Sequence, residues 1–359
     1  MKKVVSLKFI ITILIILAIC IIPLSGCTDS NYIEPAIVKN VILLIGDGMG
    51  PTHIEATKIY TDIDTLNMET LPYRGEVSTN SLSFLIPTDS AASGSAMATG
   101  QKYSNYSLSH KDGHDIKSVT EYAMENGKKT GIVVTKPLTD ATPAAFSVHT
   151  SSRYNSDIAT KQMNCGIDVM IGEGRDIYDS NATSLEEKGY DYLNTKAELD
   201  ATESNKIFGI FDSLTPECDS SLAYLSDKAI KTLNKNNDKG FFLMIEGSKI
   251  DSMSHDNNFS AMTEELVAFD EAVKVAMDFA KEDKNTMVIV TADHETGDLR
   301  LPEYPTHDNL INDCYHSGGH TNKNVLYFSY GGFSPEMPDA IENTDIFVYI
   351  MSSMNIAIE

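Results

Sequence analysis

Residues 41–47 read Val-Ile-Leu-Leu-Ile-Gly-Asp, an apolar run that ends in a carboxylate. A run with no polar alternation is typical of a strand that is buried on both faces, as in a parallel sheet. We interpret four similar runs as further buried strands, at residues 131–134, 241–245, 287–290 and 325–328, and expect an extra strand at 168–172.

Helical patterns lie between these strands. Apolar side chains recur at helical spacing within residues 116–123, 262–280 and 346–351, and Asn343 or Thr344 is positioned to cap the last of these helices. Alternating strands and helices predict an α/β fold, a three-layer α/β/α sandwich with a mainly parallel central sheet. We expect one folded domain at residues 39–359, with residues 151–240 as its least regular part.

The amino-terminal segment has the pattern of an export signal. A basic start precedes a mostly apolar run, and residues 24–27 read Leu-Ser-Gly-Cys. This motif resembles the bacterial lipobox, which implies a lipoprotein signal peptide at residues 1–26, a lipid on Cys27 and a tether at residues 27–38. The protein would then be exported to the bacterial cell surface or periplasm and anchored to the membrane. The alternative is an ordinary secretory signal with an incidental Cys27.

Composition excludes one class of partner and limits the disulfides. The formal net charge of −23 argues against nucleic-acid binding, because phosphate backbones attract basic proteins. Three cysteines follow the predicted signal, so at most one disulfide can form among them, and its pairing stays open. They are Cys165, Cys218 and Cys314.

Residues 87–100 place one hydroxyl at the start of a run of very small residues that closes on Gly100. Such a run predicts a short, tightly packed helix that ends at this glycine. Ser90 then lies at the helix N-terminus, where exposed N–H groups and the helix dipole favour an alkoxide and a bound phosphate. The simpler interpretation is an N-cap serine.

Metal-ligand residue types follow several predicted strands. Parallel strands bring such residues to one edge of the sheet, where uncompensated acids would repel one another. Divalent cations would compensate them, with mixed Asp/His groups suiting zinc and all-oxygen groups suiting magnesium. The candidates are Asp47, Asp140, Thr142, Glu246, Asp251, His255, Asp293, His294 and His320.

Six motifs give the chain a strong resemblance to the alkaline phosphatase family, from about Val41 to the C-terminal helix. They are Asp-Gly-Met-Gly at 47–50, Thr-Asp-Ser-Ala-Ala-Ser at 88–93, Asp-Ala-Thr-Pro-Ala-Ala-Phe at 140–146 followed by 149–153, Glu-Gly-Ser-Lys-Ile-Asp at 246–251 with His255, Thr-Ala-Asp-His-Glu-Thr-Gly at 291–297, and Gly-His-Thr at 319–321.

The resemblance implies an alkaline-phosphatase-like catalytic domain at residues 39–359 with two zinc ions and one magnesium ion. Ser90 would be the nucleophile and Arg153 the phosphate clamp in hydrolysis of small phosphate monoesters through a phosphoserine intermediate, which releases inorganic phosphate. The implied ligands are Asp251, His255 and His320 for one zinc, Asp47, Asp293 and His294 for the other, and Asp47, Asp140, Thr142 and Glu246 for magnesium.

Several alternatives stay open. A phosphodiesterase or a member of the same superfamily with one dedicated substrate has a comparable metal set, and a lipoprotein that only sequesters metal or phosphate would need no turnover. The chain is compact where relatives build dimers, which leaves a monomer and a homodimer both open. His316 is an alternative ligand, His149 is expected to pack behind the site, and the other histidines are expected at the surface: His53, His110, His114 and His307.

Overall fold

A computed structural model describes residues 35–359. The predicted signal peptide, Cys27 and residues 28–34 of the tether lie outside the described residues. Within the described part, no helix combines the length and the apolar character that crossing a membrane requires. Cys165, Cys218 and Cys314 are all free thiols.

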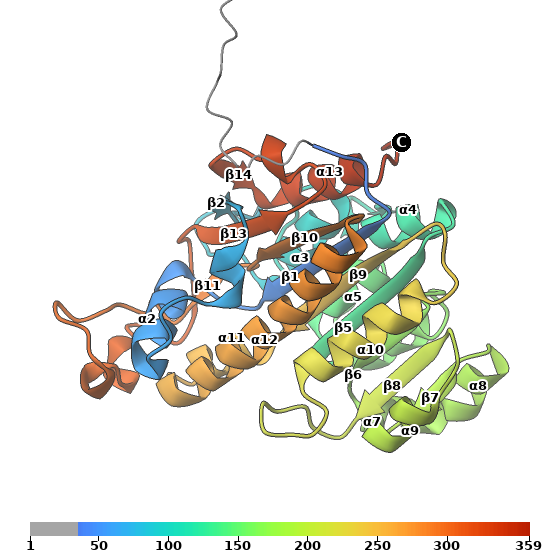
Figure 1. Ribbon diagram of the computed structural model, residues 1–359, viewed down its shortest axis with the longest axis horizontal. Coiled ribbons are helices and arrows are strands. Elements are labelled where there is room, and N and C mark those ends of the chain that lie inside the picture. The colour runs from blue at the N-terminus through green and yellow to red at the C-terminus, as the bar shows by residue number, and fades with distance from the viewer. Residues whose placement is uncertain (1–34) are drawn as a thin grey trace, which may run out of the picture. The chain divides into compact units, whose positions relative to one another are not determined.

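A ten-stranded sheet forms the centre of the domain, in the order β14-β2-β13-β10-β1-β9-β5-β6-β8-β7 (Figure 1). Its strands are β1 (Asn40–Gly46), β2 (Tyr73–Ser78), β5 (Lys129–Pro137), β6 (Val169–Glu173), β7 (Asp191–Leu193), β8 (Ile207–Phe211), β9 (Phe241–Gly247), β10 (Thr286–Thr291), β13 (Val325–Tyr330) and β14 (Ala340–Glu342).

The sheet is mainly parallel, as the sequence predicts. All pairs from β10 through β1, β9, β5, β6 and β8 to β7 run parallel, and β14 runs parallel to β2. Only β13 is antiparallel to its neighbours, β10 and β2. Every side chain of β1, β9 and β10 is buried, which explains their unbroken apolar sequences.

Helices cover both faces of the sheet and complete three layers (Figure 1). On one face α10 and α12 pack on the sheet and on each other, and on the other α4 packs with α3, α5 and α13. The helices are α2 (Pro51–Thr61), α3 (Ser90–Thr99), α4 (Val119–Glu125), α5 (Ala141–Ser147), α6 (Asn155–Gln162), α7 (Arg175–Tyr178), α8 (Ala182–Glu187), α9 (Lys196–Ala201), α10 (Leu222–Asn234), α11 (Lys249–His255), α12 (Phe259–Asp283) and α13 (Asn343–Ser353).

Two details of the sequence-based expectations are wrong. Residues 151–240 are not irregular: besides β6, which confirms the strand expected at 168–172, they form β7, β8 and the helices between them, so the sheet extends beyond the strands that we expected. Glu342, and neither Asn343 nor Thr344, is the N-cap of α13, and its backbone N–H donates to Asp345 Oδ2 at 2.9 Å. The Asn343 side chain instead donates to Ser93 Oγ and accepts from Lys102 Nζ.

Two pairs of very short strands lie outside the main sheet. They are β3 (His110–Lys111) with β4 (His114–Asp115), and β11 (Glu295–Thr296) with β12 (His320–Thr321). The second pair matters for the site, because it sets Thr296 opposite His320.

Helix α3 ends as predicted, at Gly100. This residue adopts φ 73°, and a Cβ atom added to it would lie 2.6 Å from Cδ1 of Phe347 on α13. Glycine is therefore needed both for the left-handed turn and for the close contact between the two helices.

We expect Gly100→Ala to lower the free energy of unfolding by about 2–4 kcal/mol, because it adds backbone strain and displaces Phe347. Gly113 is the matched control, since it also has positive φ (81°) but nothing within 4 Å of an added Cβ. Gly113→Ala should cost only about 1 kcal/mol. Urea unfolding of both variants measures the difference, and equal losses would contradict the helix contact.

Candidate active site

Four neighbouring strands of the sheet deliver polar side chains to one edge. β10, β1, β9 and β5 lie side by side, and their carboxyl ends lead to Asp293, Asp47, Glu246 and Asp140. The first three of these carboxylates are almost completely buried. Convergence of ligand-type residues at this edge is what the strand order of a parallel sheet imposes.

Three histidines lie at this edge, and each directs its Nε2 atom into the site. The Nδ1 atoms of His255 and His320 donate to the carbonyl oxygens of Gly318 and Thr88, at 2.7 and 2.8 Å. A carbonyl can only accept, so each Nδ1 carries the proton and each neutral ring keeps its Nε2 lone pair for the site. The two Nε2 atoms face each other at 3.1 Å.

Thr296 orients the third histidine, His294. The Thr296 hydroxyl donates to Asp251 Oδ1 at 2.6 Å and lies 3.2 Å from Nδ1 of His294. Since its only proton goes to Asp251, the hydroxyl accepts from Nδ1, and Nε2 of His294 is left with a lone pair. Burial lowers the pKa of His294, which keeps the ring neutral.

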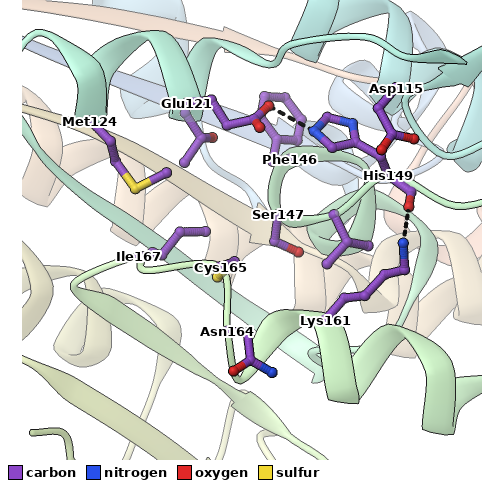
Figure 2. A pocket seen from close by; sticks show the side chains of 12 residues that line it. Asp115, Glu121, Met124, Phe146, Ser147, His149, Lys161, Asn164, Cys165 and Ile167 are labelled. Atoms are coloured by element: carbon purple, nitrogen blue, oxygen red, sulfur yellow. Dashed lines mark hydrogen bonds and ion pairs between the residues drawn. The ribbon is translucent and has the colours of Figure 1, made fainter. Parts of the chain in front are cut away.

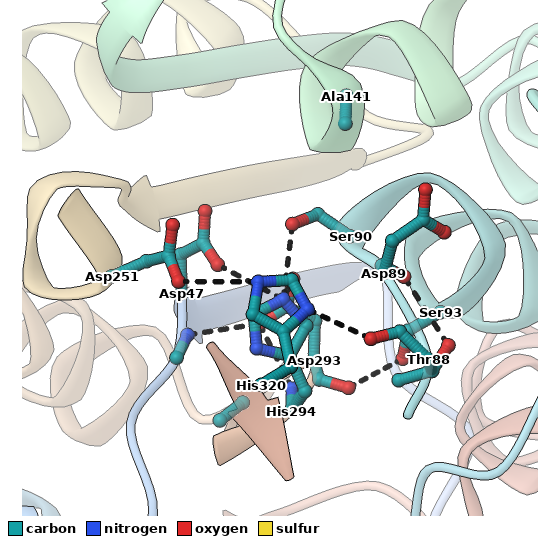
Figure 3. Close-up of polar contacts among 12 residues, drawn as sticks. Asp47, Thr88, Asp89, Ser90, Ser93, Ala141, Asp251, Asp293, His294 and His320 are labelled. Carbon is teal, nitrogen blue, oxygen red and sulfur yellow. Dashed lines mark hydrogen bonds and ion pairs between the residues drawn. The ribbon is translucent and has the colours of Figure 1, made fainter. Parts of the chain in front are cut away.

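The carboxylates and imidazoles form two overlapping groups (Figure 3). In one, Asp47, Asp293 and His294 offer ligand atoms that all lie within 4.8 Å of one another. In the other, Asp251 Oδ1 lies 3.3 Å from His255 Nε2 and 3.6 Å from His320 Nε2. His294 also lies within reach of Asp251 and His320, so it stands between the two groups.

Ser90 is the first residue of α3, and the N-cap interpretation of this serine is wrong. Asp89 is the N-cap, and its Oδ1 accepts from the backbone N–H of Ala92 at 2.9 Å. The Ser90 hydroxyl is therefore not used for capping and lies 3.1 Å from Nε2 of His294 (Figure 3). The hydroxyl thus points into the site from a helix N-terminus, where negative charge is stabilised.

Two further predicted ligands, Glu246 and Asp140, lie near these two groups, but with Asp47 they do not form a third group whose ligand atoms all lie within 4.8 Å of one another among the described residues. Glu246 is buried and accepts from Ser248 Oγ at 2.7 Å, while Asp140 caps α5 through a bond from the Ala141 N–H. Burial, with the nearby charge of Asp140, raises the pKa of Glu246 to about 8. The pKa of Asp47 is raised by burial and then by the charges of Asp251 and Asp293.

The chemistry of these residues fits divalent cations. Asp47 Oδ1, Asp293 Oδ2 and Thr142 Oγ1 are buried and have no hydrogen-bond partner. Buried polar atoms are normally satisfied, and the facing lone pairs of His255 and His320 also need a cation or a proton between them. Metal ions would satisfy these atoms and relieve the repulsion that raises the carboxyl pKa values.

Two residues of this edge, Thr296 and Lys136, were not predicted to belong to the site, although Thr296 is part of the motif at 291–297. The short β11–β12 pair sets the position of Thr296, but it leaves no periodic pattern in the sequence. Lys136 is the next-to-last residue of β5, and its ammonium group lies within 4 Å of Asp47, Asp140 and Asp251. A lone lysine before a proline gives no signal that its side chain turns into an acidic cluster.

The structure does not bring Arg153 into these groups. Arg153 is exposed, between Thr150 and α6, and its guanidinium makes no hydrogen bond or ion pair with any residue from 35 to 359. His316 is exposed and likewise outside the groups.

Three of the other histidines lie where we expected them, and His53 does not. His110 is half-buried, and His114 and His307 are exposed. His53 is completely buried in α2, where its Nε2 lies 3.1 Å from Ser254 Oγ, and burial lowers its pKa to about 3. Its expected surface position is therefore wrong.

His149 is a packing residue, as expected, but it lines a pocket separate from the two groups and does not contact them (Figure 2). Its Nδ1 donates to the Ser109 carbonyl at 3.0 Å, and its Nε2 lies 2.8 Å from Glu121 Oε2. The same pocket is lined by Lys161 and Cys165.

Comparison with known proteins assigns the family. The profile of the alkaline phosphatase family matches residues 38–312. The chain belongs to the alkaline phosphatase family. Alkaline phosphatase 4 of Bacillus subtilis is 39% identical over 301 residues, which cover 75% of this chain. The chain spans 64% of that relative's length, a little under two thirds.

Two further family members resemble the chain over most of their own length. Alkaline phosphatase of Escherichia coli is 30% identical over 419 residues, covering 91% of this chain and 88% of the relative. The solved structure of a variant of the alkaline phosphatase from the Antarctic bacterium TAB5, with Mg bound in its M3 site, superposes with a TM-score of 0.82 at 31% identity. That match covers 90% of this chain and all of the solved chain.

We expect Thr296→Val to weaken the binding of a divalent metal ion by about 10–100-fold, since it frees both Asp251 and His294 from their shared partner. Thr130→Val is the matched control, because Thr130 Oγ1 is also buried but has no partner to lose. Zinc titration of the metal-stripped proteins, followed by the rise in melting temperature, measures both affinities. Equal zinc affinities in the two variants would show that Thr296 does not orient the ligands.

Proposed function

We propose that this protein hydrolyses phosphate monoesters through a phosphoserine intermediate and releases inorganic phosphate. The observation that carries the proposal is the position of the Ser90 hydroxyl, at the N-terminus of α3 and 3.1 Å from His294 Nε2, beside two groups of Asp and His side chains. Membership of the alkaline phosphatase family supports it.

We also propose two zinc ions and one magnesium ion. Asp251, His255 and His320 would hold one zinc, and Asp47, Asp293 and His294 the other. Asp47, Asp140, Thr142 and Glu246 would hold magnesium, and the magnesium in the M3 site of the TAB5 variant supports that choice. When bound, the cations neutralise the carboxylates, lower the pKa of an oxygen nucleophile and stabilise charge on the entering and leaving oxygens.

The chain's own residues then account for the steps. The Ser90 oxygen attacks phosphorus in line with the leaving group as its hydroxyl gives up its proton, the bond from phosphorus to the leaving oxygen breaks, the leaving oxygen departs as an alcohol after taking up a proton, and a phosphoserine forms. The N-terminus of α3 stabilises the negative charge that gathers on Ser90 and the phosphate. Water then attacks phosphorus, and the Ser90 oxygen leaves with a proton.

Arg153 is proposed to clamp two phosphate oxygens that do not take part in bond exchange. Its planar guanidinium suits two parallel hydrogen bonds, and its freedom from other partners leaves it available for that contact. A monoester has three free oxygens besides the leaving one and a diester only two, so an arginine that takes two of them leaves a free oxygen for the cations only in a terminal phosphate. This favours small phosphate monoesters over the phosphodiesterase alternative.

We expect Ser90→Ala to abolish hydrolysis of p-nitrophenyl phosphate while retaining wild-type zinc content. Ser95→Ala, on the same helix, is the control, because its hydroxyl donates to the Ser107 carbonyl outside the site. The unaltered protein should be inactivated by chelation and should turn over the monoester faster than bis(p-nitrophenyl) phosphate. Full activity in Ser90→Ala would contradict the nucleophile, and a preference for the diester would contradict the substrate class.

We further propose that the protein is exported and held at the membrane by a lipid on Cys27. The Leu-Ser-Gly-Cys motif supports this proposal. Mass spectrometry of the mature protein should find an acylated cysteine as the first residue, and Cys27→Ser should move the protein from the membrane fraction to the soluble fraction. An unmodified N-terminus elsewhere would contradict the anchor.

A further inference from the structure

Lys136 is a cation enclosed by the acidic edge of the sheet. Its ammonium nitrogen lies 3.6 Å from Asp140 Oδ2, 3.7 Å from Asp251 Oδ2 and 3.9 Å from Asp47 Oδ2. The side chain is only 19% exposed. It donates no hydrogen bond within the part of the chain that the structure describes, so it acts on the three carboxylates through its charge and not as a fixed donor.

Three carboxylates, those of Asp47, Asp140 and Asp251, lie within 4 Å of the ammonium group, and opposite charges this close favour its charged form. Charges less than 4 Å apart and shielded from water interact strongly, so the ammonium ion offsets a substantial part of the negative charge of this cluster.

The two oxygens of each shared carboxylate face different partners. Asp47 turns Oδ1 toward His294 and Oδ2 toward Lys136, at 3.5 and 3.9 Å. Asp251 turns Oδ1 toward His255 and His320 and Oδ2 toward Lys136. The histidine-containing groups therefore use one set of oxygens, and Lys136 lies on the opposite side, next to Asp140.

Asp47 and Asp140, two of the three carboxylates beside Lys136, both belong to the proposed magnesium ligands. A cation bound by these oxygens would meet the positive charge of Lys136, whereas cations in the two histidine-containing groups would lie on the far side of the shared carboxylates. We call the proposed magnesium ligands Asp47, Asp140, Thr142 and Glu246 the oxygen group. The lysine should therefore weaken cation binding in the oxygen group more than in the two histidine-containing groups.

We propose that the positive charge of Lys136 lowers the affinity of the oxygen group for Mg²⁺. The two histidine-containing groups then remain the sites that bind metal ions tightly. This electrostatic role of Lys136 rests on the proposed metal assignment.

The test measures Mg²⁺ binding to the zinc-loaded protein by titration calorimetry and by elemental analysis after equilibrium dialysis. Lys136→Met removes the charge but keeps the length of the side chain, and it should bind Mg²⁺ at least tenfold more tightly with unchanged zinc content. Lys136→Arg keeps the charge and should bind Mg²⁺ as weakly as the unaltered protein. Lys129→Met is the matched control, since Lys129 lies on the same strand at its other end and donates to the Lys235 carbonyl.

Unchanged or weaker Mg²⁺ binding in Lys136→Met would overturn the proposal, and so would a loss of zinc from that variant. If Lys136→Met does not fold, Lys136→Gln replaces it with the same expected gain. The readout needs no turnover, so absent monoesterase activity in the unaltered protein would contradict the proposed function and leave the test of Lys136 intact.

Discussion

Repulsion among buried carboxylates is the constraint that the rest of the site has to satisfy. Asp47, Glu246, Asp251 and Asp293 are brought together by elements that the hydrophobic core fixes, so they cannot move apart without disrupting the sheet. Each must be hydrogen-bonded or paired with positive charge. Backbone N–H groups do part of this, as when Gly48 and His294 donate to Asp293 Oδ1.

The remaining negative charge is offset by side chains that are positively charged or that can bind a cation. Three imidazoles direct their Nε2 atoms into the site, and the ammonium group of Lys136 lies on the other side of the same carboxylates. The direction of each Nε2 atom depends on the hydrogen bond that the other ring nitrogen, Nδ1, donates. The acceptors are the carbonyl oxygens of Gly318 and Thr88 and the hydroxyl of Thr296. A site of this kind is rigid because its supporting partners are backbone atoms and a buried hydroxyl.

Much of the fold could be predicted from particular segments. The apolar runs that became β1, β5, β9, β10 and β13 are long and unbroken, and burial on both faces leaves that mark on a sequence. Strands β2, β7, β8 and β14 were missed. β7 has three residues, and the five of β8 include a glycine, so neither gives a clear period.

The site was partly predictable for the same reason. Ligand-type residues that directly follow strong strands, such as Asp47 and Asp293, could be placed at one edge because strand order fixes where strands end. Lys136 could not, because its role depends on a side-chain direction within β5. The burial of His53 was missed because α2 shows little difference between its faces, and the position of Arg153 in an exposed segment is not specified by any neighbouring element.

The histidines of the two groups differ in their access to solvent. His294 is fully buried, whereas the side chain of His255 is 38% exposed at the rim. In the proposed assignment, one ion is therefore enclosed beside Ser90 and the other is open to the medium, so their exchange rates should be unequal. When zinc is scarce, the outer ion would leave first. The protein would then stop hydrolysing its substrate, while the inner ion would still neutralise the buried carboxylates.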